Sequence, residues 1–422
     1  MFLVGMIPGP NEPPLETINH YFTPLVNELL EFWKHGVYLS RTYRHPQGRR
    51  VRCALVAIVC DLPGSRKTAG FTAPSHTHFC SICECRNSFK NHKQQYEGYV
   101  DTPFCLWKRR SAELCRAAGE QFLAATNEKE RKAAFDGTGV RWSEFHRLPY
   151  FDPSRFVVVD AMHNLFLGLT QVHCTTILGI CVRDNKTAMP SKALHIPFRN
   201  DWELLSPTEQ TAVKYLKSAL EGPLNAQIAK DRDGVIKRFE PQEEREEVDH
   251  DNNTIGEQLA ELRADISAML VPSWMSKVPS NLGDPSHGKL KADHWRMLAT
   301  VFLPASLIRL WAQTDGGDTD AESVRKRRLL EVTMSLFSAI SIATGHSTSS
   351  AKAQLYLQHY QAYIDGVKEL FPNYVFRPNH HMAFHLAEYL EMYGPVHSWW
   401  TFPFERMIGM LQRIPTNNKI CE

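Results

Sequence analysis

Residues 155–169, RFVVVDAMHNLFLGL, contain a short β-branched run that stops at an acid and continues as an apolar helical pattern. Valine runs favour strands, so this segment predicts a short strand followed by a helix. A second run, VRCALVAIVCD at 51–61, is almost continuously apolar and ends in a Pro-Gly turn. Such a run is typical of a strand buried on both faces. The sequence therefore predicts an α/β fold with a few central strands.

Most of the remaining chain has helical periodicity. Apolar residues recur three and four positions apart over 17–33, 289–311, 326–343 and 355–371, and this spacing predicts helices. Four prolines predict an extended, turn-rich segment over 1–14. The acidic run at 240–251 and the Gly- and Asp-rich run at 314–323 predict solvated breaks between helices.

Composition limits the classes of protein. The 422 residues are 43% hydrophobic and 22% charged, which suffices for a large buried core. The net charge of +2 means that nucleic-acid binding would need local basic patches, and the main basic clusters are at 107–110 and 325–328. Solvated helix faces are the alternative for both clusters.

No apolar run reaches the roughly 18 residues of a membrane span. Ten cysteines without a secretory signal favour thiols or metal ligands over disulfides.

A possible metal-binding element lies in HTHFCSICEC, which ends at Cys85. Cys80 and Cys83 form a C-x-x-C pair, a common half of a tetrahedral zinc site. His76, His78 and Cys85 are competing ligands. One pair supplies only two ligands, so ordinary thiols or a redox pair remain the alternative.

A second pair of ligands is offered by PNHHMAFHLAEYL at 378–390. His380 or His381 can converge with His385, because residues three to five apart lie near one face of a helix. With the two cysteines, His380 and His385 predict a closed Cys₂His₂ zinc site, and His381 stays open as the substitute for His380. Surface histidines on a helix are the alternative.

Acids follow the predicted strands and begin the last helix. Asp61 ends a strand, which suits a metal ligand, although the Asp-Leu-Pro-Gly sequence also suits a plain turn. Asp160 and His163 lie near the mouth of the predicted sheet, or form an N-cap with a first-turn residue. Glu405 shares a helix face with Ile408, which predicts that this face packs toward the sheet. A first-turn glutamate that complements the helix dipole is the alternative.

Taken in order, these segments resemble the Tnp2-type transposases of CACTA (En/Spm) DNA transposons, in the version common in mushroom-forming fungi. The resemblance covers nearly the whole chain. It rests on the segments MIPGPNEPP, CDLPGSRKTAGF, the cysteine pair, DAMHNLFLGL, KADHWRMLATVFLP, HHMAFHLAEYLEMYGP and FPFERMIGMLQ.

The resemblance implies a fold and an activity. These transposases are similar to the catalytic subunit of the V(D)J recombinase, which has an RNase H-like core with three acids and a helical insertion before the last. Asp61 then matches the second catalytic acid and Glu405 the last, and Asp160 with His163 matches an intervening signature. The two cysteines with His380 and His385 match a split structural zinc site. The acids would hold two Mg²⁺ or Mn²⁺ ions for DNA strand cleavage and transfer.

The resemblance also implies a division of the chain. The expected parts are a truncated RNase H-like core with the cysteine pair at 1–89, a helical or irregular insertion at 90–150, a core strand and helix at 151–170, a helical insertion domain at 171–375, and final core helices at 376–422.

The first catalytic acid of the family would lie upstream of MIPGP, where this chain has no matching strand. We therefore expect a transposase-derived chain that is catalytically inactive as written. Its expected partners are transposon-end and target DNA and further copies of itself, with no membrane, no small-molecule substrate and a nuclear location. A non-catalytic DNA-binding or interaction protein is the alternative, and a zinc-stabilised helical scaffold unrelated to DNA is a third reading.

Overall fold

The computed structural model describes residues 5, 7, 13–15, 17–90, 93–96, 102–180, 258–273, 275–284, 286, 288–312, 320–411 and 413. The expected acidic segment at 240–251 lies outside these residues. So do most of 1–14 and residues 314–319 of the break expected at 314–323. The chain forms two compact units. The first consists of Met1–Val172, Ala268–Val278 and Lys291–Glu422, and the second of His173–Ser267 and Pro279–Leu290. The stretch expected as one insertion, 171–375, is thus divided between both units.

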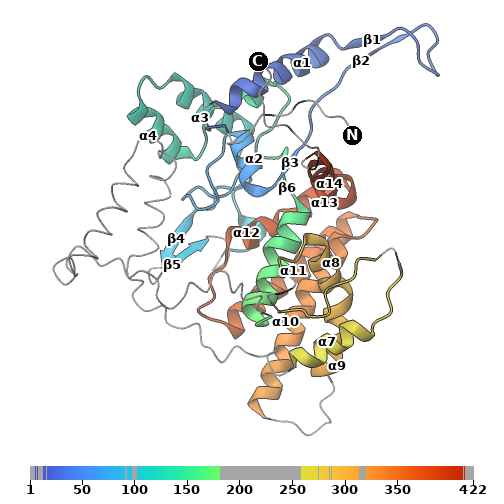
Figure 1. Cartoon of the computed structure of the whole chain (residues 1–422). Coiled ribbons are helices and arrows are strands. Elements are labelled where there is room, and N and C mark those ends of the chain that lie inside the picture. The colour runs from blue at the N-terminus through green and yellow to red at the C-terminus, as the bar shows by residue number, and fades with distance from the viewer. Residues whose placement is uncertain are drawn as a thin grey trace, which may run out of the picture. The chain divides into compact units, whose positions relative to one another are not determined.

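The first unit contains a parallel pair of strands, β3 (Ile58–Cys60) and β6 (Val157–Val159). Cys60 is in register with Val159, so the two acids that follow the strands leave the sheet at the same edge. Figure 1 shows this pair beside α2 (Leu62–Ala69). The mixed α/β class is confirmed at this coarse level.

The strand expected over 51–61 is much shorter in the structure. Only β3 forms a ladder there, and residue Val51 belongs to a different strand. Between Val51 and Ile58, backbone groups bind tyrosine side chains instead of a neighbouring strand. The Leu55 amide donates to the Tyr150 hydroxyl at 3.2 Å, and the Tyr393 hydroxyl donates to the Val56 carbonyl. Apolar composition signalled a strand, but no described neighbour pairs with this stretch.

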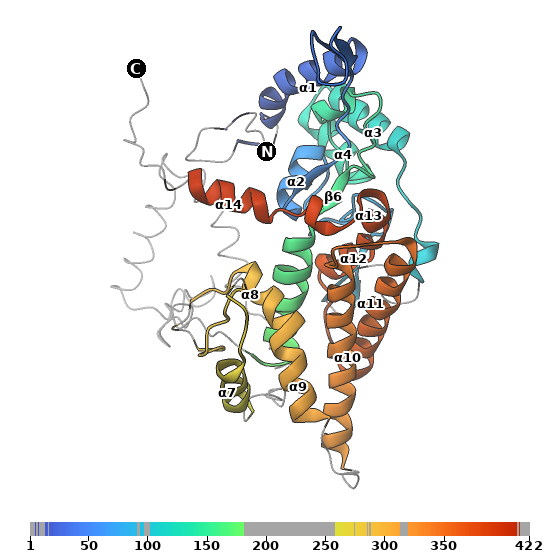
Figure 2. The ribbon, with the colours of Figure 1, turned by 90° about the vertical axis from the view of Figure 1, so that its right-hand side faces the viewer.

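The predicted helices are confirmed with small shifts of their ends. They are α1 (Ile18–Lys34), α8 (Ala292–Met297), η7 (Leu298–Phe302), α9 (Leu303–Trp311), α10 (Ala321–Ala343) and α11 (Ser350–Leu370). The apolar segment after β6 forms the π-helix η3 (Met162–Thr170). In the first unit α10 and α11 run side by side, as both Figure 1 and Figure 2 show. None of the described helices is long and apolar enough to cross a membrane.

Shorter elements complete the described chain. The first unit also contains β1 (Val37–Leu39), β2 (Arg49–Val51), β4 (Asn87–Lys90), β5 (Lys93–Tyr96), η1 (Phe104–Leu106), α3 (Ala112–Ala124), α4 (Glu128–Thr138), η2 (Glu144–Arg147), α12 (Pro378–Phe384), α13 (Leu386–Tyr393), η8 (Val396–Ser398) and α14 (Phe402–Leu411). The second unit contains η4 (His173–Ile177) and most of α7 (Leu259–Ala268).

The expected inward packing of the last helix is wrong. Residues of α14 are not buried: the exposed fraction is 37% for Met407 and 45% for Ile408. The helix follows Thr401, which is anchored on Asp160, and Figure 2 shows it running away from α10 and α11. Periodicity identified the helix, but it could not show whether a described partner covers the apolar face.

A close helix contact in the first unit depends on Gly366 of α11. A Cβ atom at this position would lie 2.2 Å from Cγ2 of Val332 on α10. Replacing Gly366 with alanine should therefore force the two helices apart, and overpacking of this kind costs about 1–3 kcal/mol. Urea unfolding of the Gly366→Ala variant measures the decrease in stability.

Gly137 of α4 is the matched control, since a Cβ there meets nothing within 4 Å. Gly137→Ala should leave stability unchanged or raise it by about 0.5–1 kcal/mol, because glycine is disfavoured in helices. Adding Val332→Ala should restore much of the stability that Gly366→Ala removes. Equal effects of the two glycine substitutions would contradict the packing argument.

Candidate metal centre and neighbouring acid cluster

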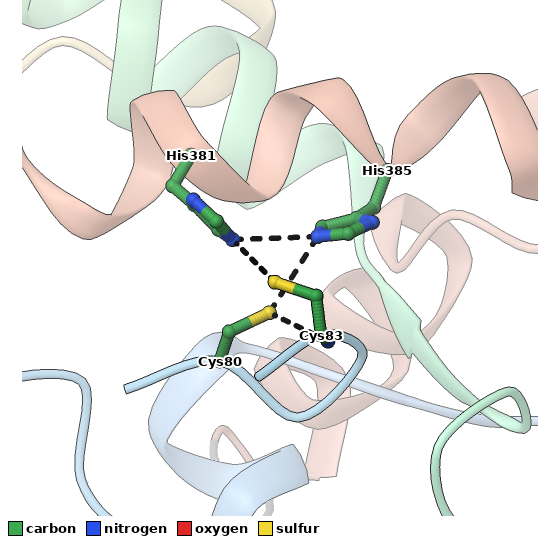
Figure 3. A group of neighbouring side chains, drawn as sticks. All are labelled: Cys80, Cys83, His381 and His385. Carbon is green, nitrogen blue, oxygen red and sulfur yellow. Dashed lines mark hydrogen bonds between the residues drawn. The ribbon is translucent and has the colours of Figure 1, made fainter. Parts of the chain in front are cut away.

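Four buried side chains from distant parts of the chain converge in the first unit. The ligand atoms of Cys80, Cys83, His381 and His385 all lie within 4.8 Å of one another. Figure 3 shows both thiols and both imidazoles pointing toward one centre, the cysteines from a loop and the histidines from the α12–α13 segment. The residues are fully buried, so an ion held here would be shielded from water.

The distances among these atoms fit a tetrahedral ion. Zinc bonds of about 2.3 Å to sulfur and about 2.05 Å to nitrogen give tetrahedral edges of about 3.6 Å between sulfur and nitrogen, and about 3.3 Å between nitrogens. The Cys80 Sγ–His385 Nε2 distance is 3.5 Å, the Cys83 Sγ–His381 Nε2 distance is 3.2 Å, and the two Nε2 atoms are 3.4 Å apart. The group can therefore hold a metal ion, and its donors are those of structural zinc.

The cysteine loop is shaped by backbone hydrogen bonds. The amides of Ile82 and Cys83 both point at the Cys80 Sγ atom, at 3.4 Å each. The Arg110 Nε atom donates to the carbonyls of Cys80 at 2.9 Å and Cys83 at 3.2 Å. The thiolate is the form of cysteine that binds metal. The loop is thus held in its shape by protein contacts.

The histidines are placed by α11. The hydroxyl of Tyr356 donates to the Ala383 carbonyl at 2.7 Å, and the hydroxyl of Tyr360 donates to the His380 carbonyl at 2.8 Å. Both tyrosines are fully buried, so these bonds fix the rotation of α12. His381 in turn stacks on Trp107, with ring centroids 4.2 Å apart and planes within 2°.

An acid supports the second histidine. The His385 Nδ1 atom lies 3.7 Å from Glu388 Oε1, and Glu388 accepts a short hydrogen bond from Arg109. A carboxylate behind a metal-binding imidazole orients the ring and raises its basicity. Arg109 also pairs with Cys83 through an antiparallel backbone bridge. Arg109 therefore contacts a cysteine ligand through its backbone and the acid behind His385 through its side chain.

His380 is not part of the group, although the sequence favoured it. Its Nδ1 accepts from the Arg377 amide at 3.1 Å, and its Nε2 lies 3.4 Å from the Tyr374 hydroxyl. Burial lowers the pKa of His380 to about 3, so it is a neutral core residue. The structure brings His381 to the cysteines in its place. The spacing His-x-x-x-His, one helical turn, was the signal that could have identified it.

Burial acts in opposite ways on the two kinds of ligand: it disfavours the thiolate that a metal ion binds, and it favours the neutral imidazole. It raises the pKa of Cys83 and lowers that of His381. A buried thiol therefore stays protonated unless a cation compensates the thiolate, whereas the imidazole is already in its neutral, ligating form. Two thiolates and two imidazoles around one divalent cation leave no net charge in the core.

The acid cluster lies at the edge of the β3–β6 pair. The Asp160 carboxylate is buried and accepts four hydrogen bonds: two from His163, through its amide at 2.9 Å and its Nδ1 at 2.6 Å, and two from Thr401, through its amide at 2.9 Å and its hydroxyl at 2.6 Å. Asp61 caps α2 by accepting from the Gly64 amide at 2.8 Å. Asp61 thus caps a helix, whereas the sequence offered a metal ligand or a plain turn, and Asp160 binds the amide of His163 as its alternative reading expected.

Glu405 approaches the cluster through His163. The His163 Nε2 atom lies 4.0 Å from Glu405 Oε1. Burial opposes protonation of His163, yet its hydrogen bond to Asp160 and the charges of Asp160, Glu405 and Asp61 raise its pKa above the ordinary value. The histidine therefore favours the charged form between acids. The family resemblance had implied one site for Asp61, Asp160, His163 and Glu405, and no motif of the sequence marked Thr401.

The acids do not form a metal-ligand set in the described part of the chain. The cysteine–histidine group is the metal-sized cluster found there. The oxygens of Asp160 are occupied by donors, and Glu405 is half exposed. Carboxylates suit Mg²⁺ or Mn²⁺ by their chemistry, and in the described residues these three acids are not drawn together as one ligand group.

A cavity borders the acid cluster and reaches residues that neighbour the metal ligands in sequence. Its lining includes Arg66, Ser81 and Met382 near the metal centre, and Asp160 and His163 of the acid cluster. The guanidinium of Arg66 is only 2% exposed and donates to the Met382 sulfur at 3.4 Å. Burial lowers the pKa of Arg66 to about 10. Ser81 of the cysteine loop and Asp160 of the acid cluster thus line the same cavity.

Both basic clusters named from the sequence are engaged in internal contacts. In 107–110, Lys108 pairs with Glu84 at 2.8 Å and Arg109 pairs with Glu388. In 325–328, Lys326 pairs with Glu322 at 2.6 Å and Arg328 with Glu369 at 2.6 Å. These contacts favour the alternative reading, in which the clusters are parts of helix and loop surfaces.

The choice of histidine gives a matched test of the metal centre. His381→Asn should reduce bound zinc from one ion per chain to nearly none, because a tetrahedral site is then left with three of its four ligands. His380→Asn should keep one zinc. Mass spectrometry of the purified chains measures the content, with circular dichroism as the check that both variants fold. Loss of zinc from His380→Asn alone would contradict the arrangement described.

The N-terminal third of the chain is similar to a known family. Residues 1–144 match the family described as Transposase family tnp2. No curated protein matches the chain. The matched segment contains Asp61, Cys80 and Cys83, and it ends before the histidines of the metal centre. Residues 1–144 are therefore similar to Tnp2-type transposases.

Proposed function

We propose that this chain is a transposon-derived, DNA-binding protein of the CACTA type, built around a structural zinc ion, in which strand cleavage is not supported by the acid cluster as it is held. The observation that carries the proposal is the convergence of Cys80 and Cys83, from the tnp2-matching segment, with His381 and His385.

A structural role for the ion follows from its ligands. Four protein side chains fill a tetrahedral zinc shell and leave no open position for water or substrate. Zinc bound in this way would tie the cysteine loop to α12 and α13. Stability, and with it DNA binding, is then the property that removal of the ion would change.

The positions of the acids support an RNase H-like arrangement, but the hydrogen bonds of their carboxylates differ from those that two-ion catalysis needs. Asp61 and Asp160 follow parallel strands in register, and Glu405 approaches from α14. A two-ion mechanism needs carboxylate oxygens that converge on the ions. Here the Asp160 oxygens accept from Thr401 and His163, and Asp61 caps a helix. In our proposal these contacts keep the cluster in a structural role, in a nuclear protein that acts as more than one copy on DNA.

The second candidate function is DDE-type strand cleavage and transfer. The in-register acids favour it, since the same residues could serve as ligands if DNA binding drew Glu405 toward Asp61. The two candidates differ in one measurable property, which is metal-dependent cleavage that requires Asp61 and Glu405.

A nicking assay on supercoiled plasmid, with Mg²⁺ or Mn²⁺, separates the candidates. We expect the full chain to shift the DNA on a gel yet to nick it no faster than Asp61→Ala and Glu405→Ala variants, because the described oxygens do not converge. Metal-dependent nicking that both variants abolish would overturn the inactive assignment and favour the DDE enzyme. Absence of any shift would overturn DNA binding.

A further inference from the structure

A long basic stretch of the sequence that contains no acids surrounds β1 and β2. From Phe32 to Cys60 the sequence has no Asp or Glu, while it has Lys34 and five arginines. The arginines are Arg41, Arg44, Arg49, Arg50 and Arg52. In a chain whose overall net charge is only +2, this concentration gives a local positive field that the net charge does not predict.

The arginines lie on an exposed two-stranded ribbon, the β1–β2 hairpin (37–52). Val37 pairs with Val51, Tyr38 with Arg50 and Leu39 with Arg49. Every residue of both strands is exposed, and so are the three arginines outside them. Figure 1 shows the hairpin projecting beyond the end of α1. The ribbon therefore presents both faces to solvent.

The hairpin has defined turn chemistry. Gly48 has a φ of 85°, and a Cβ there would lie 2.4 Å from the Tyr38 hydroxyl, which itself donates to the Gln47 carbonyl at 2.6 Å. At the tip, the Thr42 amide donates to the His45 carbonyl at 3.0 Å and the reverse bond is 3.2 Å. Only glycine fits the position beside Tyr38 without strain. These contacts hold the ribbon in one shape.

Within the described part of the chain, no acid neutralises the charges of the ribbon. Among the described residues, none of the five guanidinium groups forms an ion pair with an acid, and Arg49 instead contacts His45 Nε2 at 2.8 Å. This differs from the clusters at 107–110 and 325–328, in each of which one lysine and one arginine pair with glutamates. The tip also carries Tyr43, whose side chain is 100% exposed.

A ribbon of this kind gains little stability on its own. Isolated two-stranded hairpins are marginal in water, and here the ribbon leaves Leu39 and Val51 in solvent. Repulsion among unpaired arginines adds to that cost. A polyanionic partner would remove the repulsion and cover the apolar surface, so charge complementarity selects the partner.

We propose that the β1–β2 hairpin binds double-stranded DNA by entering a groove of the duplex. The major groove is about 12 Å wide and admits a two-stranded ribbon. Arginines suit this position because guanidinium groups bind phosphate and the guanine edge, while Tyr43 supplies apolar contact at the tip. The inference rests on the proposed DNA-binding function and assigns that function to a surface.

The test compares two triple variants of the full chain that remove the same charge. One is Arg41→Gln, Arg44→Gln and Arg50→Gln in the hairpin. The control is Lys129→Gln, Arg131→Gln and Lys132→Gln on the exposed surface of α4, where Glu128 and Glu130 lie beside the cations. Fluorescence anisotropy with a labelled 30-base-pair duplex gives Kd over a series of salt concentrations.

We expect the hairpin variant to bind the duplex at least about tenfold more weakly at 0.15 M salt. The slope of log K against log salt should fall by up to about 2.7, at roughly 0.9 for each phosphate that the variant no longer neutralises. The control should leave Kd and slope close to the parent values. Equal zinc content and circular dichroism spectra establish that both variants fold.

Three results would overturn the proposal. The first is an equal effect of both variants on duplex binding, which would leave DNA binding in place but assign it elsewhere. The second is hairpin-dependent binding to single-stranded RNA or to phosphatidylserine vesicles without binding to the duplex. The third is no duplex binding by the parent chain, which would overturn the proposed function as well. Plasmid nicking would contradict only the inactive assignment, so the two failures are distinguishable.

Discussion

Convergence of two cysteines and two histidines across about three hundred residues is the constraint on which the first unit depends. The Cys83–His381 contact spans 298 positions and the Cys80–His385 contact spans 305. Closing so long a loop costs chain entropy, but this cost rises only slowly with the length of the loop. A single strong bond network, such as four ligands on one metal ion, can therefore hold the two ends together. Structural zinc supplies on the order of 10 kcal/mol in small zinc domains, because its binding free energy is also folding free energy.

That link determines where the C-terminal part of the first unit lies. Immediately after the metal centre, the hydroxyl of Tyr389 on α13 donates to the Val157 carbonyl of β6 at 2.8 Å. Further along, the amide and hydroxyl of Thr401 bind Asp160 at the end of that strand. The metal centre, the β6 strand and the acid cluster therefore form one connected series of contacts. Loss of the ion should loosen the histidine segment first and the placement of Glu405 with it.

Part of this arrangement could be predicted from the sequence, and the rest could not because it depends on contacts between distant residues. The valines of 157–159 and the Cys-x-x-Cys pair have local signatures, so the strand and half of the metal centre could be found by pattern. His380 and His381 both satisfy helical spacing to His385, and the decision between them is made by Tyr356 and Tyr360 of α11, which fix the rotation of α12. For Met407 and Ile408, periodicity identified a helix, but exposure depends on neighbours that no local pattern describes.

Zinc-edge X-ray absorption on the purified chain tests the central link most directly. We expect a first shell of two sulfurs at about 2.3 Å and two imidazole nitrogens at about 2.0–2.1 Å, with outer-shell scattering from the imidazole rings. A shell of nitrogen and oxygen alone, or of four sulfurs, would contradict it, because neither can come from the two cysteines and two histidines that the fold brings together.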